Sequence, residues 1–233
     1  MKLYAFTDFE TSGLDIATLS PLEVAVKLCS VGPRGIIEPE NVLFTYESLI
    51  QPLDPDWASK CHPAALELHK QNGLIDAFQE AESNGVTLPT VQEVSIAISN
   101  GFQGIYDSLG LPVNIHKPSP RRAVIGRLSR LIKRQRHWDG YPASKVQTHM
   151  AGMGVANYDR PLVRHHMKEW DSHLHYRSVD VSGFSEMMEA MGWGASSKNP
   201  IRNTVEHRAM ADVNQGIEVF NYFSRNVSVS QKF

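Results

Sequence analysis

The sequence lacks the features that mark secreted and membrane proteins. Only two of its 233 residues are cysteines, too few for a disulfide framework or a cysteine-rich zinc site. No apolar run approaches the roughly 20 residues that a membrane-spanning helix needs. The first nine residues carry Lys2 and Asp8 and do not have the pattern of a signal peptide. We therefore expect no membrane association and a reducing, cytoplasmic compartment.

The chain also lacks a strong net charge, but its charges are unevenly placed. The formal net charge is −2, which predicts no partner by itself. Residues 117–136 hold eight of the 23 Lys and Arg and none of the 25 Asp and Glu. A basic segment on an acidic body suggests contact with a polyanion. A solvated helix face explains the same composition equally well, so both interpretations remain open.

The hydrophobic pattern predicts an α/β fold in a single domain. Three short apolar segments, 3–9, 23–31 and 42–50, read as strands of an antiparallel meander. Thr90 and Glu93 form a capping box ahead of an apolar helical stripe. The later elements are expected to be helices over 62–68, 94–105, 119–134, 160–170, 184–191 and 210–220 and strands over 146–153 and 176–181. This order indicates a mixed sheet flanked by helices.

A pair of carboxylates stands at the end of the first predicted strand. Residues two apart in a strand point to the same side, so Asp8 and Glu10 project together from an otherwise apolar segment. Two carboxylates held close repel one another unless a cation neutralises them. Such hard oxygen ligands suit Mg²⁺ or Mn²⁺. The alternative is that the pair is a solvated surface feature.

Two further segments carry residues that fit hydrolytic chemistry. His207 lies near the start of the last predicted helix, and Asp212 follows about one turn later. Asp159 comes after a Gly-rich turn. Each also has a structural interpretation. His207 and Asp212 can be solvated, and Asp159 can cap a helix because Arg160-Pro161 follows it.

Taken together, these three segments resemble the motifs of the DEDDh branch of the DnaQ-like 3′→5′ exonucleases. Asp8-Phe9-Glu10 resembles the first motif, Tyr158-Asp159 the end of the second, and His207-x-Ala209-x-x-Asp212 the third. The spacing of His207 and Asp212 is that of the histidine branch. The resemblance implies an RNase H-like mixed five-stranded sheet flanked by helices, in one exonuclease domain over 1–233.

Further segments resemble the oligoribonucleases within that superfamily. His175-Tyr176-Arg177-Ser178-Val179-Asp180-Val181-Ser182 is similar to the His-Tyr-Arg-x-x-Asp-Val-Ser of that family, and the segment from Leu68 to Leu74 is similar to its His-x-x-Ser-Gly-Leu. The resemblance covers most of 1–78 and 146–224. It leaves 79–145 as an inserted, partly helical and basic segment.

The resemblance implies a role for each matching residue. Asp8, Glu10, Asp159 and Asp212 would hold two divalent ions, Mg²⁺ or Mn²⁺, and His207 would be the general base. Leu14 would pack against a base as a wedge. In that family an aromatic residue packs on the same base, and its position corresponds to a place near Ala64 in this sequence, where Trp57 is the nearest aromatic residue. A homodimer is implied, because a partner subunit supplies part of the grip on the 5′ phosphate in that family. The expected substrate-binding residues are Thr11, Leu14, His69, His175, Tyr176 and Arg177.

The sequence therefore predicts a metal-dependent 3′→5′ exonuclease that releases nucleoside 5′-monophosphates from short RNA oligonucleotides. The alternative is a DnaQ-like exonuclease that acts on single-stranded DNA or longer RNA, which the basic segment favours. A catalytically inactive nucleic-acid-binding module is a third hypothesis. The presence of all five candidate catalytic residues argues against it.

Overall fold

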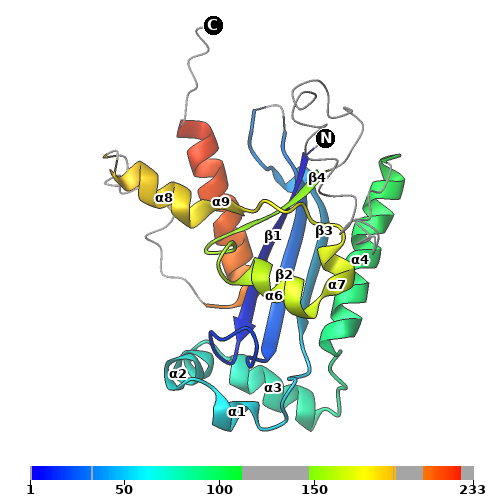
Figure 1. Ribbon diagram of the computed structural model, residues 1–233, viewed down its shortest axis with the longest axis vertical. Coiled ribbons are helices and arrows are strands. Elements are labelled where there is room, and N and C mark those ends of the chain that lie inside the picture. The colour runs from blue at the N-terminus through cyan, green and yellow to red at the C-terminus, as the bar shows by residue number, and fades with distance from the viewer. Residues whose placement is uncertain (1, 33, 112–146, 191, 193–206, 227–233) are drawn as a thin grey trace, which may run out of the picture.

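A five-stranded mixed sheet in the order β3-β2-β1-β4-β5 forms the centre of the computed structural model, which describes residues 2–32, 34–111, 147–190, 192 and 207–226 (Figure 1). β2 pairs antiparallel with both β1 and β3, whereas β4 pairs parallel with β1 and with β5. The strands are β1 (Lys2–Thr11), β2 (Pro21–Ser30), β3 (Val42–Leu49), β4 (Gln147–Gly152) and β5 (Val179–Asp180). This arrangement confirms the predicted RNase H-like α/β fold.

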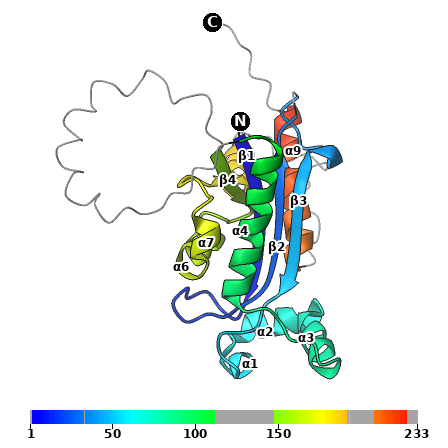
Figure 2. The ribbon, with the colours of Figure 1, turned by 90° about the vertical axis from the view of Figure 1, so that its right-hand side faces the viewer.

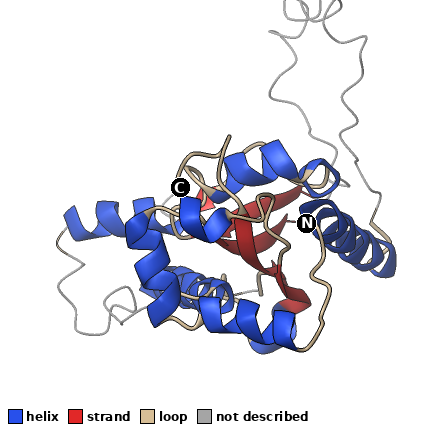
Figure 3. Ribbon diagram, turned by 90° about the horizontal axis from the view of Figure 1, so that it is seen from below, coloured by secondary structure: helices blue, strands red, loops and turns tan. Residues whose placement is uncertain are grey.

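Helices cover both faces of the sheet. Figure 2 shows α4, α6 and α7 on one face and α9 on the other, and Figure 3 shows helices on both sides of the strands. Helices α1 to α3 lie beyond the end of β1 (Figure 1). The helices are α1 (Trp57–Lys60), α2 (Pro63–Gln71), α3 (Leu74–Ser83), α4 (Val91–Ser108), α6 (Asp159–His166), α7 (Lys168–Asp171), α8 (Val181–Ala190) and α9 (Ala209–Asn226), with a 3-10 turn at Pro39–Asn41. In the part of the chain described, no helix combines the length and the apolar character that a bilayer span needs.

The alternation along β1 decides which face of the sheet receives the carboxylates of Asp8 and Glu10. Leu3 and Ala5 pack into the larger core, which α4 helps to build. Phe6 packs into the smaller core under α9. Because successive strand side chains point to opposite faces, Asp8 and Glu10 continue the row of Phe6, on the side that α9 covers. The strand therefore delivers both carboxylates to the start of α9.

Helix α4 is part of the main core, although its residues fall within the predicted insertion over 79–145. The capping box is confirmed: the Glu93 amide donates to Thr90 Oγ1 at 3.3 Å, and the Thr90 amide donates to Glu93 Oε2 at 2.8 Å. Ile98 and Phe102 are fully buried against the sheet. The basic helix predicted over 117–136 lies outside the described residues.

Two predicted elements differ from the structure. The strand expected over 176–181 is reduced to β5, because the Ser182 amide donates to Asp180 Oδ1 at 3.1 Å and helix α8 begins at once. The Asp180 carboxylate also accepts hydrogen bonds from the backbone amides of Gly154 and Ala156. These two hydrogen bonds hold the turn that precedes Asp159. The helix expected over 160–170 is divided into α6 and α7 at Met167.

Candidate active site

Three carboxylates meet where β1 ends and α9 begins. Ligand oxygens of Asp8, Glu10 and Asp212 all lie within 4.8 Å of one another. Asp8 and Glu10 come from β1, and Asp212 comes from the first turn of α9. The two motifs that suggested a metal site from the sequence are thus brought together by the packing of α9 on the sheet.

Asp159 approaches the same site from another helix. It is the first residue of α6 and is only 5% exposed. Its carboxylate accepts a hydrogen bond from the Phe9 backbone amide, and its charge contributes to raising the pKa of Asp8. The helix-capping interpretation is wrong for Asp159, because the N-cap position is Tyr158 and no side chain caps the helix there. Asp159 is not part of the group within 4.8 Å.

The electrostatics of this site favour a bound cation. Burial raises the pKa of Asp8 well above its usual range, and the charges of Asp159 and Asp212 add to the effect. Burial, with the charges of Asp212 and Glu23, raises the pKa of Glu10 to about 8. Burial likewise raises the pKa of Asp212 to about 6. A cation within the cluster would remove this repulsion and hold the carboxylates in the charged form.

One atom of the site is left without a partner by the described residues. Asp212 Oδ1 is buried and has no hydrogen-bond partner among them. A buried carboxylate oxygen is costly unless it is paired or coordinates a cation. The donor set is made only of carboxylate oxygens, which is the type that Mg²⁺ and Mn²⁺ prefer. The residues present therefore fit a hard divalent ion.

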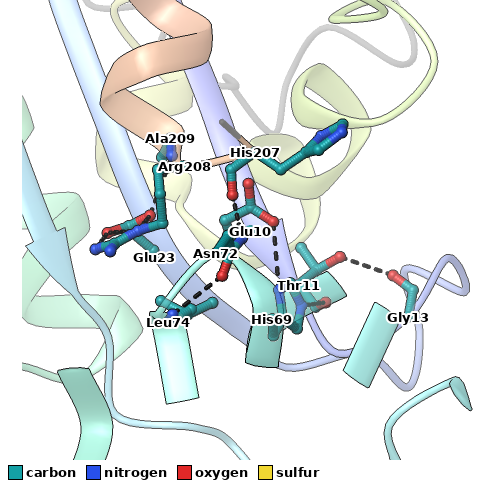
Figure 4. Close-up of polar contacts among 10 residues, drawn as sticks. All are labelled: Glu10, Thr11, Gly13, Glu23, His69, Asn72, Leu74, His207, Arg208 and Ala209. Atoms are coloured by element: carbon teal, nitrogen blue, oxygen red, sulfur yellow. Dashed lines mark hydrogen bonds and ion pairs between the residues drawn. The ribbon is translucent and has the colours of Figure 1, made fainter. Parts of the chain in front are cut away.

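His207 stands exposed, two residues before α9, at the edge of the carboxylate cluster. Its charge acts to lower the pKa of Asp212, against the larger effect of burial, which raises it. Its backbone has φ of 48°, in the left-handed region that residues other than glycine rarely adopt. Asn72 holds this backbone, because its Nδ2 donates to the His207 carbonyl (Figure 4).

The next residues of the same segment are anchored on β2. The buried Glu23 accepts from Arg208 Nε at 3.0 Å and from the Ala209 amide at 3.0 Å (Figure 4). Glu23 and Glu10 are register partners across β1 and β2. No role was predicted for Glu23 or Asn72 from the sequence. Their hydrogen-bond partners lie 135 to 186 residues away in the sequence, so no local sequence pattern predicts these contacts.

The structure places His69 behind the site rather than on an open surface. This residue of α2 is buried, at 1% exposure. Nε2 donates to the Thr11 carbonyl at 2.9 Å, and Nδ1 lies 3.6 Å from Glu10 Oε2. Burial lowers the pKa of this imidazole, which favours the neutral ring. His69 therefore supports the end of β1, and the 5′-phosphate grip expected for it stays a prediction.

A pocket of about 190 Å³ opens beside the carboxylates. Leu14 and Tyr158, 70% and 51% exposed, are two large apolar side chains on its wall. Trp57 instead packs against Phe78, with ring centroids 5.3 Å apart, and is not among the lining residues described. Tyr158, which directly precedes Asp159, is thus an aromatic residue on the same wall as Leu14, and this position was not predicted from the sequence. The pocket is lined by Asp8, Phe9, Thr11, Gly13, Leu14, Ile16, Leu19, Met153, Tyr158, Asp159 and Leu162.

The predicted phosphate grip lies in the connection between α7 and β5. The Arg177 guanidinium lies over the Tyr176 ring at 5.3 Å, and His149 Nδ1 donates to the Arg177 carbonyl at 3.2 Å. His175, Tyr176 and Arg177 are not among the described residues that line the pocket beside the carboxylates. Within one chain, the structure therefore does not bring these three residues to the carboxylates.

The chain is similar to oligoribonucleases over nearly its whole length. It is 23% identical over 223 residues to the oligoribonuclease of Mycobacterium avium (strain 104), which is 96% of this chain and 80% of that protein. It is 21% identical over 229 residues to that of Nocardia farcinica (strain IFM 10152), covering 98% of this chain and 82% of the relative. Over 81 residues, 35% of this chain and 36% of the relative, it is 35% identical to the oligoribonuclease of Corynebacterium efficiens. No family model matches the chain. The predicted similarity to oligoribonucleases is confirmed.

Proposed function

We propose that this protein is a metal-dependent 3′→5′ exoribonuclease that releases nucleoside 5′-monophosphates from short RNA. The observation that carries the proposal is the group of three carboxylates, Asp8, Glu10 and Asp212, whose ligand oxygens lie within 4.8 Å of one another. In this group, Asp212 Oδ1 has no hydrogen-bond partner among the described residues. Its place on a fold and in a sequence similar to oligoribonucleases supports the same activity.

The metal ligands in this proposal are Asp8, Glu10, Asp159 and Asp212. They would hold two divalent ions, Mg²⁺ or Mn²⁺, which when bound supply positive charge to the phosphate and to the leaving oxygen. Asp159 approaches the group of three carboxylates from α6, so the four ligands come from three separate elements. The protein's own contribution is to hold these oxygens in place before substrate arrives.

His207 is the general base of the proposed reaction. The oxygen of a water molecule forms a bond to the phosphorus of the last phosphodiester, and the water's proton passes to an imidazole nitrogen of His207. The bond from phosphorus to the 3′ oxygen of the preceding nucleotide breaks, and that oxygen keeps the bonding electrons and takes a proton from solvent. An imidazole suits this step because its ordinary pKa lies near neutral pH. The exposure of His207 allows the ring to exchange its proton with solvent.

The pocket beside the carboxylates, called the catalytic pocket from here on, receives the base of the 3′ nucleotide. Leu14 and Tyr158 offer an aliphatic and an aromatic side chain on its wall, and every base has a flat face on which such groups pack. Packing of this kind tolerates all four bases. Tyr158 here takes the place that the family's aromatic residue would have near Ala64.

The grip on the 5′ phosphate is shared between two chains in this proposal. His175, Tyr176 and Arg177 lie outside the catalytic pocket of their own chain, which supports a homodimer in which each chain completes the other's site. Arg177 suits this task because its planar group gives two hydrogen bonds to one phosphate. The cytoplasmic location stays a prediction.

The test is the hydrolysis of labelled RNA and DNA series from two nucleotides upward, with Mg²⁺ or Mn²⁺ and with EDTA. We expect 5′-monophosphates to appear from the 3′ end of short RNA, and we expect EDTA and the Asp8→Asn substitution to stop the reaction. Full activity in EDTA would contradict the metal-dependent mechanism. Faster cleavage of single-stranded DNA or long RNA would favour the DnaQ-like alternative.

A further inference from the structure

A second pocket adjoins the catalytic pocket and carries excess positive charge. Its volume is about 530 Å³, and it is lined by Ile16, Ala156, Arg160, Pro161, Arg164, His165, Lys168, Tyr176 and Ser178. Ile16 lines both pockets. The His166 ring donates to the Ile16 carbonyl at 3.0 Å, so the wall between the two pockets is attached to α6.

The basic residues of this pocket come from two consecutive helices. Arg160 and Arg164 stand one turn apart in α6, Lys168 begins α7 after the break at Met167, and all three line the pocket. Asp159, directly before the first of them, lines the catalytic pocket instead. The α6–α7 segment therefore presents a carboxylate to the catalytic pocket and three cations to the second pocket.

The residues that the structure describes neutralise only part of this positive charge. Arg160 is buried and forms an ion pair with Asp171. Arg164 and Lys168 are exposed, and the Arg164 guanidinium has no hydrogen bond or ion pair to any residue that the structure describes. The Lys168 ammonium donates to the Arg164 carbonyl and forms no ion pair with a residue in the described part of the chain. Asp15, next to Ile16, instead accepts from Ala17 and Thr18 of its own turn.

We propose that this second pocket binds the phosphodiester groups of the nucleotides that lie 5′ of the terminal dinucleotide. The proposal rests on the proposed exonuclease function and extends its substrates to RNA of more than two nucleotides. A strand whose 3′ nucleotide occupies the catalytic pocket meets Arg164 and Lys168 after it passes Ile16. Arg and Lys side chains bound to phosphate add affinity without sequence preference.

The test compares a dinucleotide with a five-nucleotide RNA. In the Arg164→Gln/Lys168→Gln double variant, we expect KM for the longer RNA to rise about tenfold, as for the loss of one charge-assisted hydrogen bond. We expect kcat for both substrates and KM for the dinucleotide to stay at the wild-type value. The slope of log affinity against log salt for the longer RNA should become shallower by about 0.7 for each phosphate that the variant no longer binds.

A matched control removes the same charge elsewhere. Arg34→Gln/Arg225→Gln changes two exposed cations that do not line either pocket, and we expect it to behave as wild type. An equal rise of KM for both substrates, or no rise for the longer RNA, would overturn the phosphate site. If the wild type hydrolyses neither substrate, the proposed function fails. In that case, fluorescence anisotropy with the labelled five-nucleotide RNA tests the phosphate site independently of catalysis. Equal affinity of the double variant and the control variant for this RNA would overturn the phosphate site.

Discussion

The pH dependence of stability in metal-free buffer tests the carboxylate cluster directly. Glu10 is 8% exposed, and its pKa is raised from an ordinary value of 4.5 to about 8 by burial and by the charges of Asp212 and Glu23. A group whose pKa is higher in the folded than in the unfolded chain binds more protons when folded. Its contribution to stability is full below about pH 4.5 and is lost as the pH rises through about 8. The metal-free protein should therefore become less stable across this range.

The size of the effect follows from the shift. Each pKa unit corresponds to about 1.4 kcal/mol, so the shift of Glu10 amounts to an upper bound on the order of 5 kcal/mol at pH 8. At about 2–4 °C per kcal/mol for a domain of this size, the melting temperature should fall by at most about 10–20 °C. The Glu10→Gln substitution removes this ionisable group and keeps the shape, so the melting temperature of the variant should fall less than that of the wild type, with the remaining fall due to Asp8 and Asp212.

The assay is thermal denaturation in EDTA at several pH values, repeated with Mg²⁺. We expect Mg²⁺ to stabilise the wild type most at the high end of the range, because the charged carboxylates bind it, and to stabilise Glu10→Gln less. Glu80→Gln makes the same change on the exposed surface of α3 and should follow the wild type. A flat wild-type curve, or the same fall in Glu10→Gln as in the wild type, would refute the electrostatic argument.

Three further substitutions test the positions of the catalytic groups. His207→Ala should lower kcat about 10²–10⁴-fold with little change in KM, as for removal of a general base, and wild-type turnover would show that another group activates the water. Asn72→Ala removes the hydrogen bond to the His207 carbonyl and should lower kcat about fivefold. The neighbouring Gln71→Ala serves as its control, and an equal loss in both would mean a general effect on α2. Gly152→Ala would place a Cβ 2.7 Å from the Thr7 carbonyl oxygen, next to Asp8, and should destabilise the protein by about 1–3 kcal/mol in urea unfolding. Gly104→Ala meets nothing within 4 Å and should not destabilise.

The amino-acid sequence by itself was sufficient for the features that depend on near neighbours. The alternation of β1, the capping box at Thr90 and the one-turn spacing of His207 and Asp212 are local, and each predicts its structure correctly. The same holds for the pairing of Asp8 with Glu10 on one side of a strand. The predicted strand over 176–181 was wrong in its length. The Asp180 carboxylate accepts a hydrogen bond from the Ser182 amide, so helix α8 begins there and the strand ends early.

Only the tertiary structure decided what lies around the catalytic carboxylates. It placed Tyr158 on the wall that Leu14 also lines, buried His69 against Glu10, and anchored the His207 segment through Glu23 and Asn72. These contacts join residues from different strands and helices, many of them more than 100 positions apart. The periodicity of a sequence reports which face of an element is buried, but it does not report which distant element covers that face. The docking of α2, α6 and α9 around the end of β1 supplied that information.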